Sequence, residues 1–216
     1  MKVIIFSDTH LEKDFNKKKY LFLKKIIQKS DRIIINGDFW EGYTTNFNEF
    51  INSPWKKLFP YLKSKKTVYI FGNHDRKKYS DKNVFLFCNK AIDKYSLKIN
   101  KKVYVFEHGG QWADFIDSFF GGETPGWFVK VYNKVVNMFV MIFRKKFLMI
   151  YKIVNEKAKK KALNKSNKNN FLVYGHTHYG EIDLKNNIAN TGLIKYGFGQ
   201  YLLIDDGKLS LHQQWY

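Results

Sequence analysis

Three short apolar runs within the first 72 residues set the strongest constraint on the fold. Residues 2–7 (KVIIFS), 31–37 (DRIIING) and 66–72 (KTVYIFG) are rich in β-branched side chains and end in polar residues or Gly. Such runs are typical of buried strands. Apolar residues at helical spacing over 16–30 predict an amphipathic helix, and a second helix is expected over 47–59. Strands that alternate with helices predict right-handed crossovers and a mostly parallel sheet.

The pattern changes in the rest of the chain to short strand-like segments separated by tight turns. Asn100 with Lys101 is typical of a hairpin turn, and Asn-Asn and Asp-Gly pairs separate the later segments. We expect a second sheet rich in antiparallel pairs, packed face to face with the first, with helices outside, in an α/β fold. Only 3 prolines and no Ser/Gly-rich linker occur, which predicts a single domain over 1–216. The strand-like segments are 84–87, 93–99, 101–108, 170–175, 180–184, 187–192, 200–205 and 208–212.

Residues 112–168 interrupt this pattern with two predicted helices rich in large apolar side chains. A membrane-spanning helix needs roughly 20 unbroken apolar residues. Here Lys130, Lys134 and the cluster 144–146 interrupt the run too often. Two interpretations of this helical insertion remain open. It is either a hairpin packed on the core, or a cap with an apolar inner face and a basic rim that suits an amphiphilic ligand.

The formal net charge is +19, from 38 Lys+Arg and 19 Asp+Glu. This charge predicts attraction to polyanions, which include nucleic acids, anionic membrane surfaces and phosphorylated substrates. It is concentrated between residues 126 and 169, where 12 Lys/Arg stand against one acid, Glu156. The single Cys88 excludes an intrachain disulfide, and residues 1–10 lack a signal-peptide pattern, so we expect a cytoplasmic protein.

Polar side chains of the kinds that bind metals follow the predicted strands at five places. Each motif alone carries little information, because an acid after a strand is usually a turn or a cap. Together the motifs hold all but one of the 6 histidines, the exception being His212. Ligands of open sheets bind beyond the carboxyl ends of strands, so we expect the motifs to converge. They are SDTH (Asp8, His10), NGD (Asp38), GNHD (Asn73, His74, Asp75), EHGG (His108) and YGHTH (His176, His178).

The spacing and the chemistry of these residues both favour a metal centre. Asp8 and His10 lie two residues apart, so they point the same way if the extended geometry of the strand continues, and the same holds for His176 and His178. Asp, Asn and His side chains without thiolates suit Mn²⁺, Fe²⁺ or Zn²⁺. Seven such ligands are too many for one ion, but they suffice for two ions that share a carboxylate, as in displacement at phosphorus.

The ordered set D-x-H, G-D, G-N-H-D, H-G and G-H-x-H resembles the calcineurin-like metallophosphoesterases. The resemblance implies the two-sheet α-β-β-α sandwich of that family and two divalent ions, with Mn²⁺ expected and Fe²⁺ or Zn²⁺ as alternatives. It also implies that a metal-bound hydroxide attacks phosphorus. By the same resemblance Asp38 would bridge the ions, with Asp8, His10 and His178 on the first and Asn73, His108 and His176 on the second.

The residues that follow Asn73 receive further roles from the resemblance. His74 would stay free of metal and stabilise the transition state or protonate the leaving oxygen. Asp75 would orient the His74 ring, as carboxylates behind a catalytic or ligating histidine do. Arg76 would meet a phosphate or, equally, be a surface charge.

Within the family the insertion resembles that of the UDP-2,3-diacylglucosamine diphosphatase group of lipid A biosynthesis. The resemblance implies a lipid-linked nucleotide substrate whose acyl chains lie in the helical cap. Three differences from that group stand in this sequence: Gly110 in place of an Asp, His74 in place of an Arg, and no Asp-Trp after Asn190-Thr191-Gly192. The residues expected to bind substrate are Arg76, Lys130, Tyr132, Asn133, Lys134 and Asn137.

Two other functions are consistent with parts of the sequence. A nuclease or general phosphodiesterase of the same fold would use the basic charge to bind nucleic acid. A non-catalytic module would use the basic helices to bind a membrane or a partner. The complete ligand set favours the enzyme, because converging buried carboxylates and histidines are costly without metal. The apolar and basic insertion favours a lipid-linked substrate and a peripheral position on the inner face of the cytoplasmic membrane.

Overall fold

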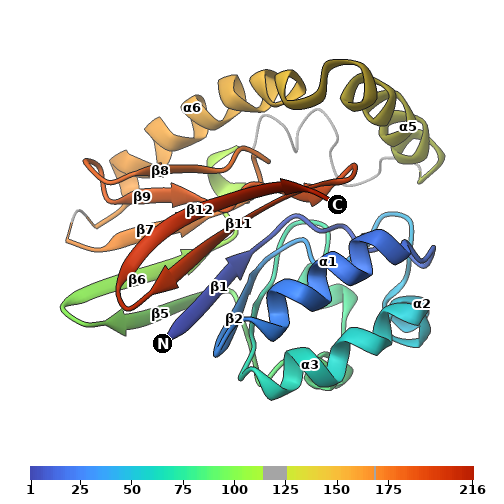
Figure 1. Cartoon of the computed structure of the whole chain (residues 1–216), viewed down its shortest axis with the longest axis horizontal. Coiled ribbons are helices and arrows are strands. Elements are labelled where there is room, and N and C mark those ends of the chain that lie inside the picture. Colours follow the sequence, from blue (N-terminus) through green and yellow to red (C-terminus); the bar gives the residue numbers. More distant parts are fainter. Residues whose placement is uncertain (114–125, 168) are drawn as a thin grey trace.

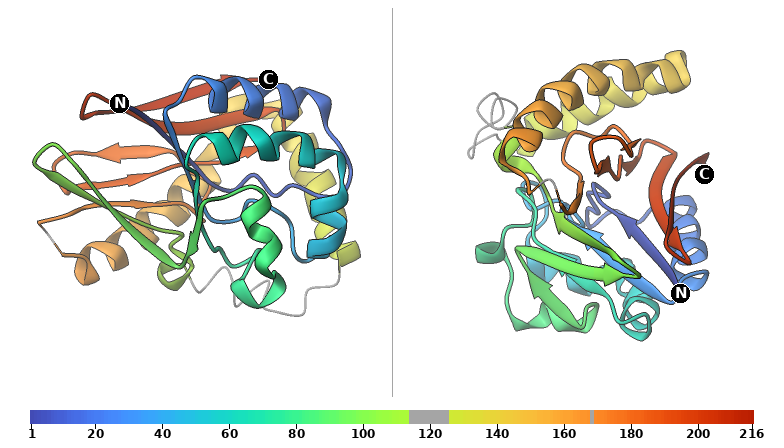
Figure 2. Two further views of the ribbon diagram at one scale, coloured as in Figure 1. Left: turned by 90° about the horizontal axis from the view of Figure 1, so that it is seen from below. Right: turned by 90° about the vertical axis from the view of Figure 1, so that its left-hand side faces the viewer.

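The computed structural model describes residues 1–113, 126–167 and 169–216. These residues form two sheets that pack face to face, with helices on both outer sides (Figure 1). This arrangement confirms the predicted α-β-β-α sandwich. Helices α1, α2 and α3 lie on one side, and α5 and α6 lie on the other (Figures 1 and 2).

The first sheet is built on the three strands that the sequence predicts. β1 (Lys2–Phe6), β2 (Arg32–Asn36) and β3 (Val68–Ile70) are parallel neighbours, and β4 (Lys90–Ile92) continues the parallel order. Their carboxyl ends therefore lie at one edge of the sheet, which is where the polar motifs follow. The predicted strand at 84–87 is wrong, because residues 84–86 belong to the 3₁₀ helix η3 (Lys82–Leu86) and Phe87 is its C-cap.

The last strands extend this first sheet and not the second, contrary to the sequence-based prediction. β11 (Phe198–Asp205) pairs antiparallel with β1, and β10 (Ile194–Lys195) and β12 (Lys208–Trp215) both pair with β11. Leu202 and Ile204 of β11 are buried between the sheets, so the apolar pattern of the strand is satisfied on this side too.

The second sheet has the order β5-β6-β7-β9-β8. β5 (Lys94–Ile99) and β6 (Lys102–Glu107) form the predicted hairpin, with Asn100 at φ +54° in the turn. β6, β7 (Phe171–Tyr174) and β9 (Ile188–Asn190) are parallel, and β8 (Glu181–Asp183) is antiparallel to β9. Half of these pairs are thus parallel, because the insertion between β6 and β7 acts as a crossover.

Four helical segments cover the outer face of the first sheet. Asn16 caps α1 (Lys17–Gln28), which buries Phe22, Leu23, Ile26 and Ile27 as its spacing predicts. The predicted second helix is divided, because Ser53 and Pro54 end α2 (Phe47–Asn52) and begin η1 (Pro54–Leu58). α3 (Phe59–Ser64) follows directly. The aromatic side chains of these helices pack on the sheet around Phe39 and Phe87.

The insertion contributes two long helices to the opposite side. After η4 (Gly110–Trp112), the described chain resumes with α5 (Gly126–Phe143), η5 (Arg144–Phe147) and α6 (Leu148–Lys165). Ala158 and Ala162 let α6 pack closely on Leu172 and Tyr174 of the second sheet. Neither helix, nor any other in the described ranges, combines the length and apolarity that crossing a membrane requires.

A buried amide reinforces the packing of α6 on the second sheet. Asn155 Oδ1 accepts hydrogen bonds from the hydroxyls of Tyr174 and Thr177, both at 2.7 Å, and from Asn190 Nδ2 at 3.1 Å. Asn155 Nδ2 donates to Glu181 at 2.7 Å. The Asn155 side chain is fully buried, so water cannot take its place as the hydrogen-bond partner of these groups. α6 is therefore part of the fold and not a detachable cover.

We expect Asn155→Ala to lower the free energy of unfolding by about 2–4 kcal/mol, because it leaves several buried donors without an acceptor. Chemical denaturation measures the change. Asn164→Ala, at an exposed position of the same helix, is the matched control and should shift the value by less than about 0.5 kcal/mol. Equal stability of the two variants would show that the buried amide is not what attaches α6.

Candidate metal centre

The five polar motifs meet at one edge of the sandwich, each just after a strand. Asp8 and His10 follow β1, Asp38 follows β2 and Asn73 follows β3. His108 follows β6 of the second sheet. His176 and His178 follow β7 of the same sheet. The two sheets thus supply opposite halves of one cluster.

The backbone at this edge is not the extended one that the sequence predicts. Asp8, His10, Asp38, His176 and His178 all have positive φ, between 42° and 66°. Non-glycine residues rarely adopt this left-handed conformation, and it persists only where surrounding contacts enforce it. The i, i+2 residues therefore converge because the chain turns, and not because the strands continue.

Asp8, His10 and His178 form one group of possible metal ligands. Each offers one ligand atom, and these atoms lie within 4.8 Å of one another. His178 Nε2 is 3.3 Å from Asp8 Oδ1 and 3.3 Å from His10 Nε2. Ser7 Oγ and the His176 amide donate to Asp8 Oδ2, which leaves Oδ1 directed toward the histidines.

Asp38, His108 and His176 form a second group of the same kind. His108 Nε2 lies 3.1 Å from Asp38 Oδ2 and 2.9 Å from Asn73 Oδ1. His176 Nδ1 lies 2.9 Å from the same Asn73 oxygen. The other nitrogen of His108, Nδ1, is 2.9 Å from the Asn36 carbonyl, which fixes its ring.

Asp38 lies between the two groups. Its Oδ2 is 3.1 Å from His108 Nε2, 3.8 Å from His10 Nε2 and 3.9 Å from His74 Nε2. Its Oδ1 accepts the His74 amide at 2.9 Å. This is the position that a carboxylate shared by two ions would need.

The chemistry of the group fits metal ions. Asp8 Oδ1 is buried and faces the His178 ring, with Nε2 at 3.3 Å. Such an atom is costly to bury unless a cation meets it. The oxygen and imidazole donors suit Mn²⁺, Fe²⁺ or Zn²⁺. The residues that would hold two such ions are Asp8, His10, Asp38, Asn73, His108, His176 and His178.

Without a cation the pKa values of the imidazoles differ widely. Burial opposes the charge on His108, but Asp38 and Asp8 outweigh it and raise the pKa of His108 to about 10. Burial lowers the pKa of His10 to about 4, helped by the charge of Lys195. Burial and the nearby His108 lower the pKa of His176 to about 3. The carboxylates that raise the pKa of His108 favour a positive charge at this position, and a divalent cation would also supply one.

Glu41 is a residue of the centre that sequence reasoning missed. Its carboxylate is fully buried and contacts His74 Nδ1 at 2.6 Å and His10 Nδ1 at 3.0 Å. Burial disfavours the charged form of His74, but Glu41 and Asp38 raise its pKa to about 9. The available signal was the acid three residues after Asp38, in the GDFWEG stretch.

The predicted role of Asp75 is wrong. Its two carboxylate oxygens accept the backbone amides of Asp38 (3.1 Å), Phe39 (2.6 Å) and Gly72 (2.6 Å), and not the His74 ring. Asp75 therefore fixes the turn that carries Asp38, and Glu41 makes the contact to His74. Gly72 is required at this turn, because a Cβ there would overlap Asp38 Oδ1 and the Asp38 amide nitrogen.

The expected substrate-binding residues lie in different surroundings. Arg76 Nε donates to the Asn73 carbonyl at 3.1 Å. Asn133 Oδ1 accepts from Lys195 Nζ and the Tyr196 hydroxyl, both at 3.0 Å. Tyr132 is hydrogen-bonded to Tyr151, Asn137 lines a cavity with His10, and Lys134 is exposed. Lys130 lies in α5, but its side chain is outside the described residues.

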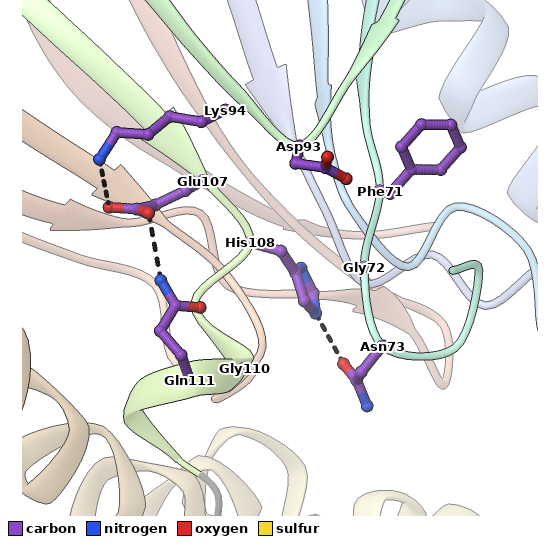
Figure 3. A pocket seen from close by; sticks show the side chains of 9 residues that line it. All are labelled: Phe71, Gly72, Asn73, Asp93, Lys94, Glu107, His108, Gly110 and Gln111. Carbon is purple, nitrogen blue, oxygen red and sulfur yellow. Dashed lines mark hydrogen bonds and ion pairs between the residues drawn. The ribbon is translucent and has the colours of Figure 1, made fainter. Parts of the chain in front are cut away.

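A cavity of about 390 Å³ opens beside His108 and Asn73 (Figure 3). Figure 3 shows Glu107 joined to Lys94 and to Gln111 on one wall, with Asp93 and Phe71 on the other side of His108. A further cavity lies on the His10 side of the centre. The cluster is thus accessible from two sides.

Comparisons with known proteins identify the family of the chain. A model of the calcineurin-like phosphoesterase family matches residues 1–180. No curated protein matches the chain. An archaeal phosphodiesterase of solved structure is similar over 99% of this chain and 100% of its own, with 16% identity and a TM-score of 0.55. YfcE, a phosphoesterase from E. coli, covers 97% of this chain and 91% of its own, with 17% identity and a TM-score of 0.49. At such identity the archaeal structure shows a shared fold alone.

We expect Mn²⁺ to raise the thermal unfolding temperature of the metal-free protein, because an ion that binds only the folded state stabilises it. Asp38→Asn should abolish this rise, since it removes the charge between the two groups. His212→Ala, a histidine outside the cluster that stacks on Tyr201, is the control and should keep the rise. A rise in Asp38→Asn equal to that of the unaltered protein would contradict the shared-carboxylate assignment.

Proposed function

Because the chain belongs to the calcineurin-like phosphoesterase family, it is a metal-dependent phosphoester hydrolase, and we propose that it cleaves the diphosphate of a lipid-linked nucleotide sugar of the UDP-2,3-diacylglucosamine kind. The observation that carries the lipid part of this proposal is a large apolar face on α5, described below. Mn²⁺ is the proposed metal, with Fe²⁺ or Zn²⁺ as alternatives for the same donors.

The apolar face of α5 is formed by five exposed side chains on successive turns. Residues of an α-helix are about 100° apart, so a spacing of four, four, three and four keeps side chains on one face. Val136 and Val140, which pack on the core near Leu193 and Phe198, lie on the opposite face of the helix. The apolar stripe comprises Trp127 (67% exposed), Val131 (50%), Val135 (43%), Met138 (54%) and Ile142 (63%).

This stripe differs from the apolar inner face that a closed cap would have. The core-facing part of α5 is small, and the larger apolar area is open to the surroundings. α6 exposes large apolar side chains as well: Met149 is 66% exposed, Ile150 70% and Ile153 64%. Contiguous exposed apolar side chains of this number mark a binding surface rather than ordinary solvent contact.

Basic side chains border the apolar stripe. Lys134, Arg144, Lys146 and Lys152 are exposed, and the segment 126–169 holds 12 Lys/Arg and one acid. An apolar helix face with a cationic border is suited to the surface of an anionic bilayer, where acyl chains meet phosphate headgroups. We therefore place the enzyme, in this proposal, on an anionic membrane surface, with the acyl chains of its substrate against α5.

The chemistry proposed for the centre divides between metal and protein. Two divalent ions held by the seven ligands would neutralise charge on the phosphoryl oxygens and lower the pKa of water. His74 Nε2 lies 3.9 Å from Asp38 Oδ2, next to the reacting group. With His10 and Glu41 it forms a third group of possible metal ligands, but in this proposal it stays free of metal. Glu41 holds the other nitrogen of His74, which keeps the ring protonated and directed at the centre.

We expect His74→Ala to keep Mn²⁺ bound but to reduce turnover of bis(p-nitrophenyl) phosphate by about 10²–10⁴-fold, the scale of a single acid or electrostatic group. Steady-state kinetics and metal analysis measure the two effects separately. Loss of metal together with turnover would make His74 a ligand and overturn its proposed role. His212→Ala again serves as the control.

The substrate is tested by mass spectrometry with Mn²⁺ supplied. We expect UDP-2,3-diacylglucosamine to yield UMP and a lipid phosphate, with kcat/KM at least about 10-fold above that of UDP-N-acetylglucosamine, because acyl chains bury apolar area on α5. Val135→Asp should lower this preference, and sedimentation with phosphatidylglycerol vesicles, by about 10-fold.

Leu86→Asp is the matched control, because Leu86 is 50% exposed but lies in η3, away from α5. It should leave the preference and the vesicle binding within about twofold. Equal turnover of the acylated and unacylated substrates would contradict the proposal. Salt-sensitive cleavage of single-stranded DNA in place of either would favour the nuclease.

A further inference from the structure

A cavity of about 410 Å³ adjoins the metal centre on the His10 side. α1 contributes Lys19, β10 and the residue after it contribute Lys195 and Tyr196, and α5 contributes Asn137. The cavity therefore connects a candidate metal ligand with the helix that carries the apolar stripe. A substrate bound at both places would pass through it.

Two lysines of this cavity lack an acidic partner. Lys195 is half-buried, and its ammonium donates to the neutral Asn133 Oδ1 at 3.0 Å and lies 5.2 Å from the centroid of the Tyr196 ring. Lys19 is only 7% exposed, and its ammonium donates to the carbonyl of Thr9, the residue between Asp8 and His10. Among the described residues neither lysine forms an ion pair.

The two lysines are near enough to repel each other, and the acids of the cavity compensate their charge only from beyond ion-pair distance. Burial lowers the pKa of Lys19 to about 7, and the positive charge of Lys195 contributes to the shift. Glu12 and Asp14 line the same cavity, but neither carboxylate is within ion-pair distance of the two lysines. An anion that entered beside His10 would relieve this repulsion and gain a charge-assisted hydrogen bond.

The backbone holds Lys195 in register with the metal centre. The amide of Ile194 donates to the Asp8 carbonyl at 3.2 Å, and β10 is paired with β11. Lys195 therefore follows a residue that is bonded directly to a candidate ligand. Of the two lysines it is the more exposed, so it is the one that can reach a bound molecule.

We infer that Lys195 binds an anionic group next to the scissile phosphorus, so that the enzyme selects diphosphates over simple phosphate esters. This inference rests on the proposed function, in which the second phosphate of the nucleotide diphosphate is that anion. Lys19 adds positive charge from the wall of the cavity. Lys195 is on this account a specificity-determining residue and takes no part in holding metal.

Binding of two probes to the Mn²⁺-loaded protein, measured by calorimetry, tests the inference without turnover. Methylenediphosphonate carries two phosphonates and methylphosphonate carries one. We expect the diphosphonate to bind about 10- to 100-fold more tightly, the range of one hydrogen bond to a charged group. Lys195→Met should abolish this advantage and leave methylphosphonate binding within about twofold.

Two variants and a metal assay complete the experiment. Lys195→Arg keeps the charge and should keep most of the advantage, whereas Lys185→Met removes a charge at an exposed turn and should change nothing. Manganese in the recovered protein is measured, so that extraction of metal by the diphosphonate is not mistaken for binding. A diphosphonate advantage that persists in Lys195→Met, or equal weakening of both probes, would overturn the inference. Failure to cleave the lipid-linked nucleotide would overturn the proposed function and not this result.

Discussion

The buried carboxylate of Asp38 is the feature on which the rest of the centre depends. It ends a strand of the first sheet, and its Oδ2 lies 3.1 Å from a histidine of the second sheet. A carboxylate in this position is unfavourable unless every neighbour supports its charge. Burial opposes ionisation, but His108 and His74 hold the pKa of Asp38 well below its usual range. The carboxylate of Asp75 fixes the backbone turn that carries Asp38, because it accepts hydrogen bonds from three backbone amides. Asp38 has a left-handed backbone conformation, which is strained for a non-glycine residue, and these contacts hold it in place.

The two helices of the insertion serve different ends. α6 belongs to the fold, because Asn155 bonds Thr177, which stands between His176 and His178 in the chain. Tyr151 of α6 also lies edge-on to the His178 ring, with centroids 5.1 Å apart. α5 contacts the core through few side chains and leaves a wide apolar face open. The interpretation of a packed hairpin therefore describes α6, whereas a role of α5 in binding substrate stays a prediction.

Much of the fold and of the candidate site could be predicted from the sequence, because the signals are local. β-branched runs before polar motifs place Asp8, Asp38 and Asn73 at strand ends, and the strand order brings them to one edge. Long-range choices could not be predicted. β11 pairs with β1 across nearly the whole chain, and no local pattern distinguishes that partner from the second sheet. Asp75 and Glu41 are both acids near His74, and only the turn geometry decides which one meets its ring. Lys195 lies outside every motif. Its lack of an acidic partner depends on which residues the fold places around it, and the sequence does not show this.

The positions of the cavities constrain how a two-phosphate substrate can lie. One cavity adjoins His108 and Asn73, with the polar side chains of Glu107, Gln111 and Asp93 around it (Figure 3). The other adjoins His10 and carries the unpaired lysines. In the proposed function the reacting phosphorus lies at Asp38, and the groups on its two sides can each enter one cavity. Of these two cavities only the second is lined by α5, through Asn137, so the proposal puts the acyl-bearing part and the phosphate next to it on that side. The nucleoside would then face the hydrogen-bonding groups of the first cavity, so polarity favours one orientation of the proposed substrate over the other.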